Sequence, residues 1–151
     1  MTQSLPPKSL VLYADDDPDD IQLLSEAFQV YSNDLELMTF TDGMELLTFI
    51  ETIDPFYVAP CLFILDINMP RLNGKETLRR LRRLDSFADV PAVLFSTSSL
   101  PADAAFAKNF NAGFVTKPLH TSQVHLIIDE IIEHCSDDVK RNIRRKNRNN
   151  N

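Results

Sequence analysis

The stretch LYADDDPDDIQLL, residues 12–24, joins an apolar segment to a run of acidic residues. Five of the six residues from Asp15 to Asp20 are aspartates, and they follow an apolar run at 10–14 that would fit inside a protein core. Like charges held this close raise one another's pKa and cost stability. We therefore expect a positive partner, either a metal ion or a lysine, at the same site.

The chain has the length and composition of one soluble domain. Its 151 residues are 44% hydrophobic and 25% charged, which suits a single core. The longest apolar run, 56–65, has ten residues, whereas a membrane span needs about 20. The first ten residues lack the basic and apolar regions of a signal peptide. We therefore expect no membrane association and a cytoplasmic protein, with Cys61 and Cys135 as reduced, buried or half-buried thiols.

Charge is distributed unevenly along the chain. The last twelve residues, 140–151, hold six basic side chains and no acidic one, which leaves the remainder strongly acidic. A net-acidic body argues against general nucleic-acid binding. We expect a folded domain over residues 8–135 and a basic, disordered, solvated tail over residues 136–151.

Short apolar runs alternate with longer segments of helical period, which is typical of repeated βα units. The predicted strands are 10–14, 35–40, 61–65, 92–96 and 113–117. The predicted helices are 18–30, 43–53, 74–84, 101–110 and 121–135. In the third, we expect Leu78, Leu81 and Leu84 to face inward and Arg79, Arg80, Arg82 and Arg83 to form a solvated face. In the fifth, an apolar stripe recurs at steps of three and four through Val124, Ile127, Ile128, Ile131, Ile132 and Cys135. Three of the strands are almost wholly apolar, as strands covered on both faces must be. With right-handed crossovers the pattern predicts an α/β fold, a doubly wound five-stranded parallel sheet of strand order 2-1-3-4-5 with five helices, flavodoxin-like.

Polar residues follow four of the predicted strands at the point where each strand ends. Asp15, Asp16 and Asp17 follow the first strand. The third strand is followed by Asp66, the fourth ends at Ser96 and the fifth at Lys117. In a doubly wound sheet the carboxyl ends of the strands meet in one crevice, which binds ligands. The sequence therefore predicts a pocket containing carboxylates, a hydroxyl and an ammonium group.

At these residues the chain resembles the receiver domains of bacterial two-component response regulators, in particular the chemotaxis-type single-domain receivers. The resemblance covers about residues 8–135 and rests on YADDDPDD, ILDINMPRLNG, VLFSTSS and FVTKP, in that order. It implies that Asp66 accepts a phosphoryl group from a phosphohistidine of a histidine kinase or phosphotransfer protein. It also implies that Asp15 and Asp16 hold Mg²⁺, and that Ser96 and Lys117 contact the phosphoryl oxygens.

The residue types also make chemical sense apart from the resemblance. Phosphoryl transfer depends on alignment and on neutralising charge on the equatorial oxygens. Mg²⁺ prefers octahedral oxygen ligands and keeps several waters, which Asp16, Asp66 and the backbone carbonyl of Asn68 would suit. A divalent cation and Lys117 would offset the negative charge of the acidic cluster. A helix that begins near Pro18 would also present the positive end of its dipole to the acidic residues in its first turn.

Three alternatives use the same acidic residues. Asp15, Asp17, Asp19 and Glu26 stand at positions 1, 3, 5 and 12 of a calcium loop, but position 6 lacks glycine. Asp15 and Asp17 could also mimic the Asp-x-Asp pair of a haloacid dehalogenase-type phosphatase, although the chain leaves little room for a cap. The third alternative is a non-phosphorylated pseudo-receiver that acts as a protein-binding module.

We expect no output domain after the fifth predicted strand, and therefore expect the protein to signal by protein contact rather than to act as an enzyme. The resemblance implies that Phe114 is the switch aromatic and that the bond between Lys117 and Pro118 is cis. We expect Ser96 to move toward a phosphoryl group on Asp66 and Phe114 to fill the vacated space. The fourth helix has few apolar residues, so we expect helix four, strand five and helix five to carry the contact with a downstream target or in a homodimer.

Overall fold

The computed structural model describes residues 9–54 and 59–149. Among these residues, five parallel strands form one sheet in the order β2-β1-β3-β4-β5. The strands are β1 (Ser9–Ala14), β2 (Leu35–Phe40), β3 (Pro60–Leu65), β4 (Ala92–Ser96) and β5 (Gly113–Thr116). The helices are α1 (Pro18–Phe28), α2 (Gly43–Thr52), α3 (Gly74–Leu81), α4 (Pro101–Asn109), α5 (Val124–Ile132) and α6 (Asp137–Asn149), with short 3₁₀ helices η1 (Gln29–Tyr31) and η2 (Thr121–Gln123). The predicted flavodoxin-like sheet and its strand order are confirmed.

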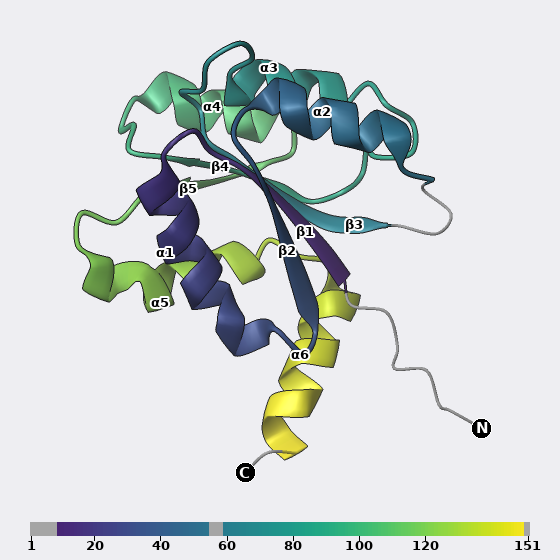
Figure 1. Cartoon of the computed structure of the whole chain (residues 1–151), viewed down its shortest axis with the longest axis vertical. Coiled ribbons are helices and arrows are strands. Elements are labelled where there is room, and N and C mark those ends of the chain that lie inside the picture. The colour runs from purple at the N-terminus through teal and green to yellow at the C-terminus, as the bar shows by residue number, and fades with distance from the viewer. Residues whose placement is uncertain (1–8, 55–58, 150–151) are drawn as a thin grey trace.

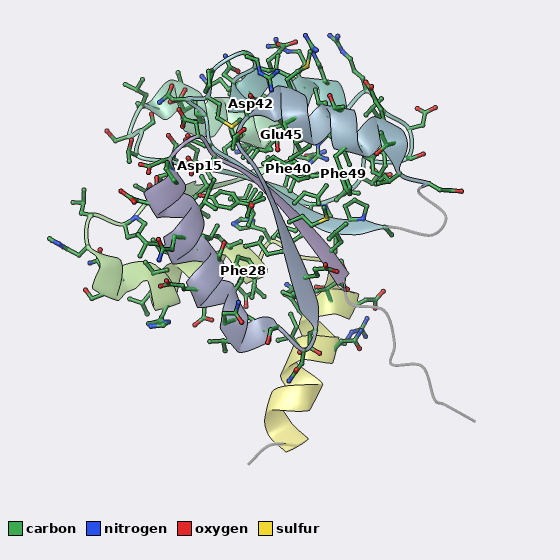
Figure 2. The ribbon with its side chains drawn as sticks, viewed as in Figure 1. Asp15, Phe28, Phe40, Asp42, Glu45 and Phe49 are labelled. Carbon is green, nitrogen blue, oxygen red and sulfur yellow. The ribbon has the colours of Figure 1, made fainter. Side chains whose placement is uncertain are left out.

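The sheet separates two layers of helices (Figure 1). Helices α2, α3 and α4 cover one face, and α1 and α5 cover the other. The rings of Phe40 and Phe49 meet on the α2 face with centroids 5.4 Å apart. Figure 2 shows them on the opposite side of the sheet from Phe28 of α1. Cys61 and Cys135 pack with the α1 and α5 layer as free thiols, half-buried and buried respectively, as predicted.

Three helices begin with a side-chain cap at the carboxyl edge of the sheet. The side chains of Asp17, Asp42 and Asn73 accept hydrogen bonds from backbone amides in the first turns of α1, α2 and α3, which satisfies donors that a helix leaves unpaired. Burial acts to raise the pKa of Asp42, but the amide of Glu45 and the guanidinium of Arg71, 2.7 Å away, outweigh it and lower that pKa. The caps fix the loops that surround the site.

The carboxyl-terminal residues contain a helix where disorder was predicted, so that prediction is wrong for residues 137–149. Val139 and Ile143, four residues apart in α6, pack against the core, and Ile143 is only 4% exposed. Asp137 and Asp138 occupy the first turn, where negative charge is favoured by the helix dipole. Figure 1 shows α6 near the amino-terminal end of β1, extending away from the sheet. Among the residues that the structure describes, no helix is long and apolar enough to cross a membrane.

Several helix boundaries also differ from the prediction, most of all those of α3 and α5. Helix α3 ends at Leu81, and Leu84, which was expected to face inward, is 37% exposed. Residues Thr121–Gln123 form η2, so the α-helix begins at Val124 rather than at Thr121. The apolar stripe predicted for α5 is buried, and burial of that stripe holds the helix against the sheet.

Arg82, expected on the solvated face of α3, instead lies at the end of that helix and donates hydrogen bonds to four backbone carbonyls. Its Nε donates to Phe110 at 2.8 Å. Its Nη1 donates to Ala88 at 3.1 Å and to Val90 at 2.7 Å, and its Nη2 donates to Asn111 at 3.2 Å. The residue therefore joins α3 to the segments that precede β4 and β5.

Candidate functional site

Three aspartates meet at the carboxyl ends of β1 and β3. Asp15, Asp16 and Asp66 each offer a carboxylate oxygen, and these oxygens all lie within 4.8 Å of one another. The neighbouring strands place them there, because the Asp66 amide donates to the carbonyl of Ala14 at 2.9 Å. Asp15 is fully buried, Asp66 is 5% exposed and Asp16 is exposed. Figure 2 shows Asp15 where β1 gives way to α1. Carboxylate oxygens gathered in this way suit part of the coordination shell of a divalent cation.

Lys117 follows β5 and brings a buried ammonium group to the same edge. Its Nζ lies 2.8 Å from Asp15 Oδ2, 2.8 Å from Asp20 Oδ2 and 3.4 Å from Asp66 Oδ1. Burial acts to lower the pKa of Lys117, but its hydrogen bonds to Asp15 and Asp20 outweigh that effect and raise the pKa. The side chain is 8% exposed and carries a positive charge between three carboxylates. The lysine expected from the acidic run is therefore in place.

Two residues of the site were not predicted. The Tyr13 hydroxyl donates to Asp15 Oδ2 at 2.5 Å, and Asp20 is the second close partner of Lys117. Asp15 Oδ1 accepts the backbone amide of Asp17 at 3.0 Å, so both Asp15 oxygens are engaged. Strand alternation placed Tyr13 on the same face as Asp15, which was the signal available in the sequence.

Burial and the charge of Asp15 leave Asp66 with a raised pKa. Burial is the largest cause and the negative charge of Asp15 is the next, while Lys117 and the backbone amide of Asn68 act in the opposite direction. Together they raise the pKa of Asp66 to about 7. Lys117 therefore does not by itself offset the effects of burial and of the Asp15 charge on the pKa of Asp66. A second positive charge at the site would lower that pKa.

The acidic residues after Asp16 have structural positions. The Asp17 side chain accepts the amide of Asp19 at 2.9 Å and caps α1. Because β1 ends at Ala14 and α1 begins at Pro18, residues 15–26 form a short connection and a helix rather than a calcium loop. Asp17 is exposed, and its side chain caps α1. It therefore does not join Asp15 to form the Asp-x-Asp pair of a phosphatase.

Ser96 and Phe114 lie on adjacent strands. Ser96 is buried at the end of β4, and its Oγ accepts the backbone amide of Ser98 at 3.1 Å. Phe114 lies on β5 opposite Leu94 and is half-buried against the α4 side of the core. Every peptide bond of the described residues is trans, so the prediction of a cis bond before Pro118 is wrong. The trans isomer is favoured before proline by about 0.5–1 kcal/mol.

Comparison with known proteins gives one family. The family described as "Response regulator receiver domain" matches residues 11–129. Response regulator Rcp1 from Synechocystis sp. (strain ATCC 27184 / PCC 6803 / Kazusa) is 29% identical over 98 residues, which cover 64% of this chain and 66% of Rcp1.

Solved structures show the same fold. The phosphorylated cyanobacterial phytochrome response regulator RcpA superimposes with a TM-score of 0.75 at 27% identity, covering 84% of this chain and 93% of RcpA. The Mn²⁺-bound form of Rcp1 gives a TM-score of 0.73 at 23% identity, covering 84% of this chain and 93% of Rcp1.

Proposed function

Because the chain belongs to the response regulator receiver domain family, we propose that it is a response regulator that accepts a phosphoryl group on Asp66. The observation that carries the proposal is the position of Asp66. It is buried beside the Lys117 ammonium and within 4.8 Å of the Asp15 and Asp16 carboxylates. In this proposal the protein is a phosphoacceptor and not an enzyme that turns over a separate substrate.

The transfer exchanges one bond for another. The phosphorus–nitrogen bond of the donor's phosphohistidine breaks as a bond forms between phosphorus and an Asp66 oxygen. Lys117, already 3.4 Å from Asp66 Oδ1, would neutralise an equatorial phosphoryl oxygen. The hydroxyl of Ser96 would donate to another of these oxygens. Asp20 and Asp15 hold the ammonium in place, so little rearrangement is needed when the donor arrives.

The carboxylate set suits Mg²⁺. Asp15, Asp16 and Asp66 supply oxygen ligands at one point, and the backbone carbonyl of Asn68 would complete the protein's share, with waters in the remaining positions. When bound, the ion supplies positive charge to the transferring phosphoryl group and to the cluster. Tyr13 and the Asp17 amide orient Asp15, which leaves the exposed Asp16 as the most accessible ligand.

The surface beside the site suits a protein phosphodonor. A cleft of about 210 Å³ lies between α1 and α5, next to Asp20, and apolar residues form most of its lining. Leu119, at its rim, is 90% exposed. We propose that a histidine kinase or phosphotransfer protein binds here, in the cytoplasm. The downstream protein, or a second copy in a homodimer, then contacts α4, β5 and α5 after Ser96 and Phe114 change position.

Phosphorylation by a small donor tests the proposal. Incubation with acetyl phosphate and Mg²⁺ should add one phosphoryl group to the intact protein, as measured by mass spectrometry. Asp66→Asn should remain unlabelled and EDTA should abolish labelling. Asp17→Asn is the matched control, because it changes a neighbouring aspartate that caps α1, and it should be labelled like the wild type.

The same experiment separates the receiver from a pseudo-receiver. Unchanged labelling of Asp66→Asn would show that another residue is the acceptor. A wild-type protein that stays unlabelled by acetyl phosphate and by a panel of phosphorylated histidine-containing proteins would favour the protein-binding module without phosphorylation.

A further inference from the structure

Helix α4 is held at its first turn by a charged side chain rather than by apolar packing. Asp103 and Ala107 are its buried residues, and Asp103 is only 6% exposed. Phe106 and Phe110 stack on each other, with ring centroids 4.6 Å apart. Both are half-buried. An element with so few buried apolar groups depends strongly on its polar contacts.

Each oxygen of the Asp103 carboxylate has a partner on a different segment. Oδ1 forms an ion pair with Nζ of Lys75, the second residue of α3. Oδ2 accepts the hydroxyl of Ser98, in the loop between β4 and α4. The hydrogen bonds to Lys75 and Ser98 hold the pKa of Asp103 below its usual value, although burial acts to raise it. Asp103 is therefore a buried, ionised carboxylate with both oxygens engaged.

Both partners of Asp103 lie beside the phosphorylation site. The backbone amide of Ser98 donates to Ser96 Oγ at 3.1 Å. Lys75 directly follows Gly74, whose amide donates to the carbonyl of Ile67 at 3.0 Å, in the loop after Asp66. The network thus joins the loop that follows Asp66 to the loop after β4, whose Ser98 contacts the switch hydroxyl of Ser96.

We propose that Lys75, Asp103 and Ser98 form a latch that opposes the displacement of α4 when Asp66 is phosphorylated; this rests on the proposed function. In the structure, Ser96 Oγ accepts the Ser98 amide, and the Ser98 hydroxyl donates to Asp103. Movement of Ser96 toward Asp66 strains or breaks these contacts. Interactions that are present in only one of two conformations stabilise that conformation. The latch therefore favours the conformation shown here and lowers the fraction of molecules in which α4 is displaced and Ser96 can contact a phosphoryl group on Asp66.

The latch predicts that weakening it improves binding of a phosphoryl mimic. In titrations with beryllofluoride at saturating Mg²⁺, Lys75→Met and Ser98→Ala should each bind about tenfold more tightly than the wild type. Lys75→Arg keeps the charge and should behave like the wild type. Arg80→Met is the matched control, because it removes an exposed ion pair with Glu76 on the same helix, and it should also leave beryllofluoride affinity unchanged.

A second measurement examines the latch in the absence of beryllofluoride. Amide hydrogen exchange in residues 98–109 of the free protein should be faster in Lys75→Met and Ser98→Ala than in the wild type and Arg80→Met. Unchanged or weaker beryllofluoride binding in both latch variants would overturn the latch, and so would unchanged exchange. If the wild type itself binds no beryllofluoride, the proposed function is wrong and the latch has no phosphorylation to oppose.

Discussion

Replacing Arg82 with methionine should destabilise the protein by about 3 kcal/mol. The guanidinium donates to the carbonyls of Phe110, Ala88, Val90 and Asn111. A hydrogen bond to a charged group contributes about 1.5–3 kcal/mol net, so four such bonds would contribute about 6–12 kcal/mol if they were additive and fully buried. Arg82 is only half-buried, and water can replace part of what the carbonyls lose, which gives the smaller figure.

Urea unfolding followed by circular dichroism measures this difference. Arg82→Lys should restore less than half of the loss, because one ammonium cannot reach four carbonyls with the geometry of a guanidinium. Arg83→Met, at an exposed neighbouring position, is the control and should change the free energy of unfolding by less than about 0.5 kcal/mol. If Arg82→Met unfolds at the same urea concentration as Arg83→Met, the four hydrogen bonds do not stabilise the fold and the reasoning is refuted.

Three further predictions concern the site and its edge. Gly74→Ala should lower the free energy of unfolding by about 1–3 kcal/mol and slow labelling by acetyl phosphate. The new Cβ would lie 2.1 Å from the backbone oxygen of Asp66, so the loop would have to shift. Labelling and stability like those of the wild type would contradict this. Asp42 has a lowered pKa, so its charge stabilises the fold above the unfolded-state pKa of about 3.9 and that stability is lost as the pH falls through the lower, folded-state pKa. Asp42→Asn should therefore be less stable than the wild type by about 1 kcal/mol at pH 7. Urea unfolding at several pH values should show this difference disappearing as the pH falls through the folded-state pKa of Asp42; a difference independent of pH would refute the sign. In isothermal titration, Asp16→Ala should bind Mg²⁺ markedly more weakly than the wild type. Lys117→Ala should bind Mg²⁺ as well as the wild type or better, because a competing positive charge is gone. Wild-type affinity in both variants would show that these roles are wrong.

The sequence predicted the fold and the main site residues because both depend on local patterns. Apolar strands alternate with helices of regular period, and in a parallel sheet the residue after each strand must lie at one edge. Asp66 and Lys117 follow β3 and β5 directly, so their meeting required only the strand order. The positions of Asp15 and Ser96 follow for the same reason.

What the sequence did not predict depends on partners distant along the chain. Arg82 was predicted to be one of several solvated arginines. Its partners are backbone carbonyls, which every residue has, so the sequence gives no sign of which residues it contacts. Asp20 lies in the first turn of α1, and its pairing with Lys117 depends on how that helix is set against β5. The helix α6 was missed because its sequence is mostly basic and polar, and few apolar residues signal its packing: Val139 and Ile143 are the ones that contact the core among the side chains that the structure describes.

The position of α4 shows how composition can mislead. An alanine-rich helix with two half-buried phenylalanines suggested an element that moves easily, and its displacement on phosphorylation stays a prediction. The structure adds a buried ion pair at its first turn, through Asp103, and a hydrogen bond from Arg82 to the carbonyl of Phe110 after its last. Both contacts come from α3 or its end, so the stability of α3 affects the freedom of α4.

The most direct test of the account is to identify the residue that carries the phosphoryl group. After reaction with acetyl phosphate and Mg²⁺, borohydride reduces an aspartyl phosphate to homoserine, and tandem mass spectrometry of the peptides locates the change. The account predicts homoserine at position 66 alone, and only when the donor and Mg²⁺ were both present. Homoserine at Asp15, Asp16 or Asp20, or an unreduced aspartate at position 66 in protein that had gained a phosphoryl group, would contradict it.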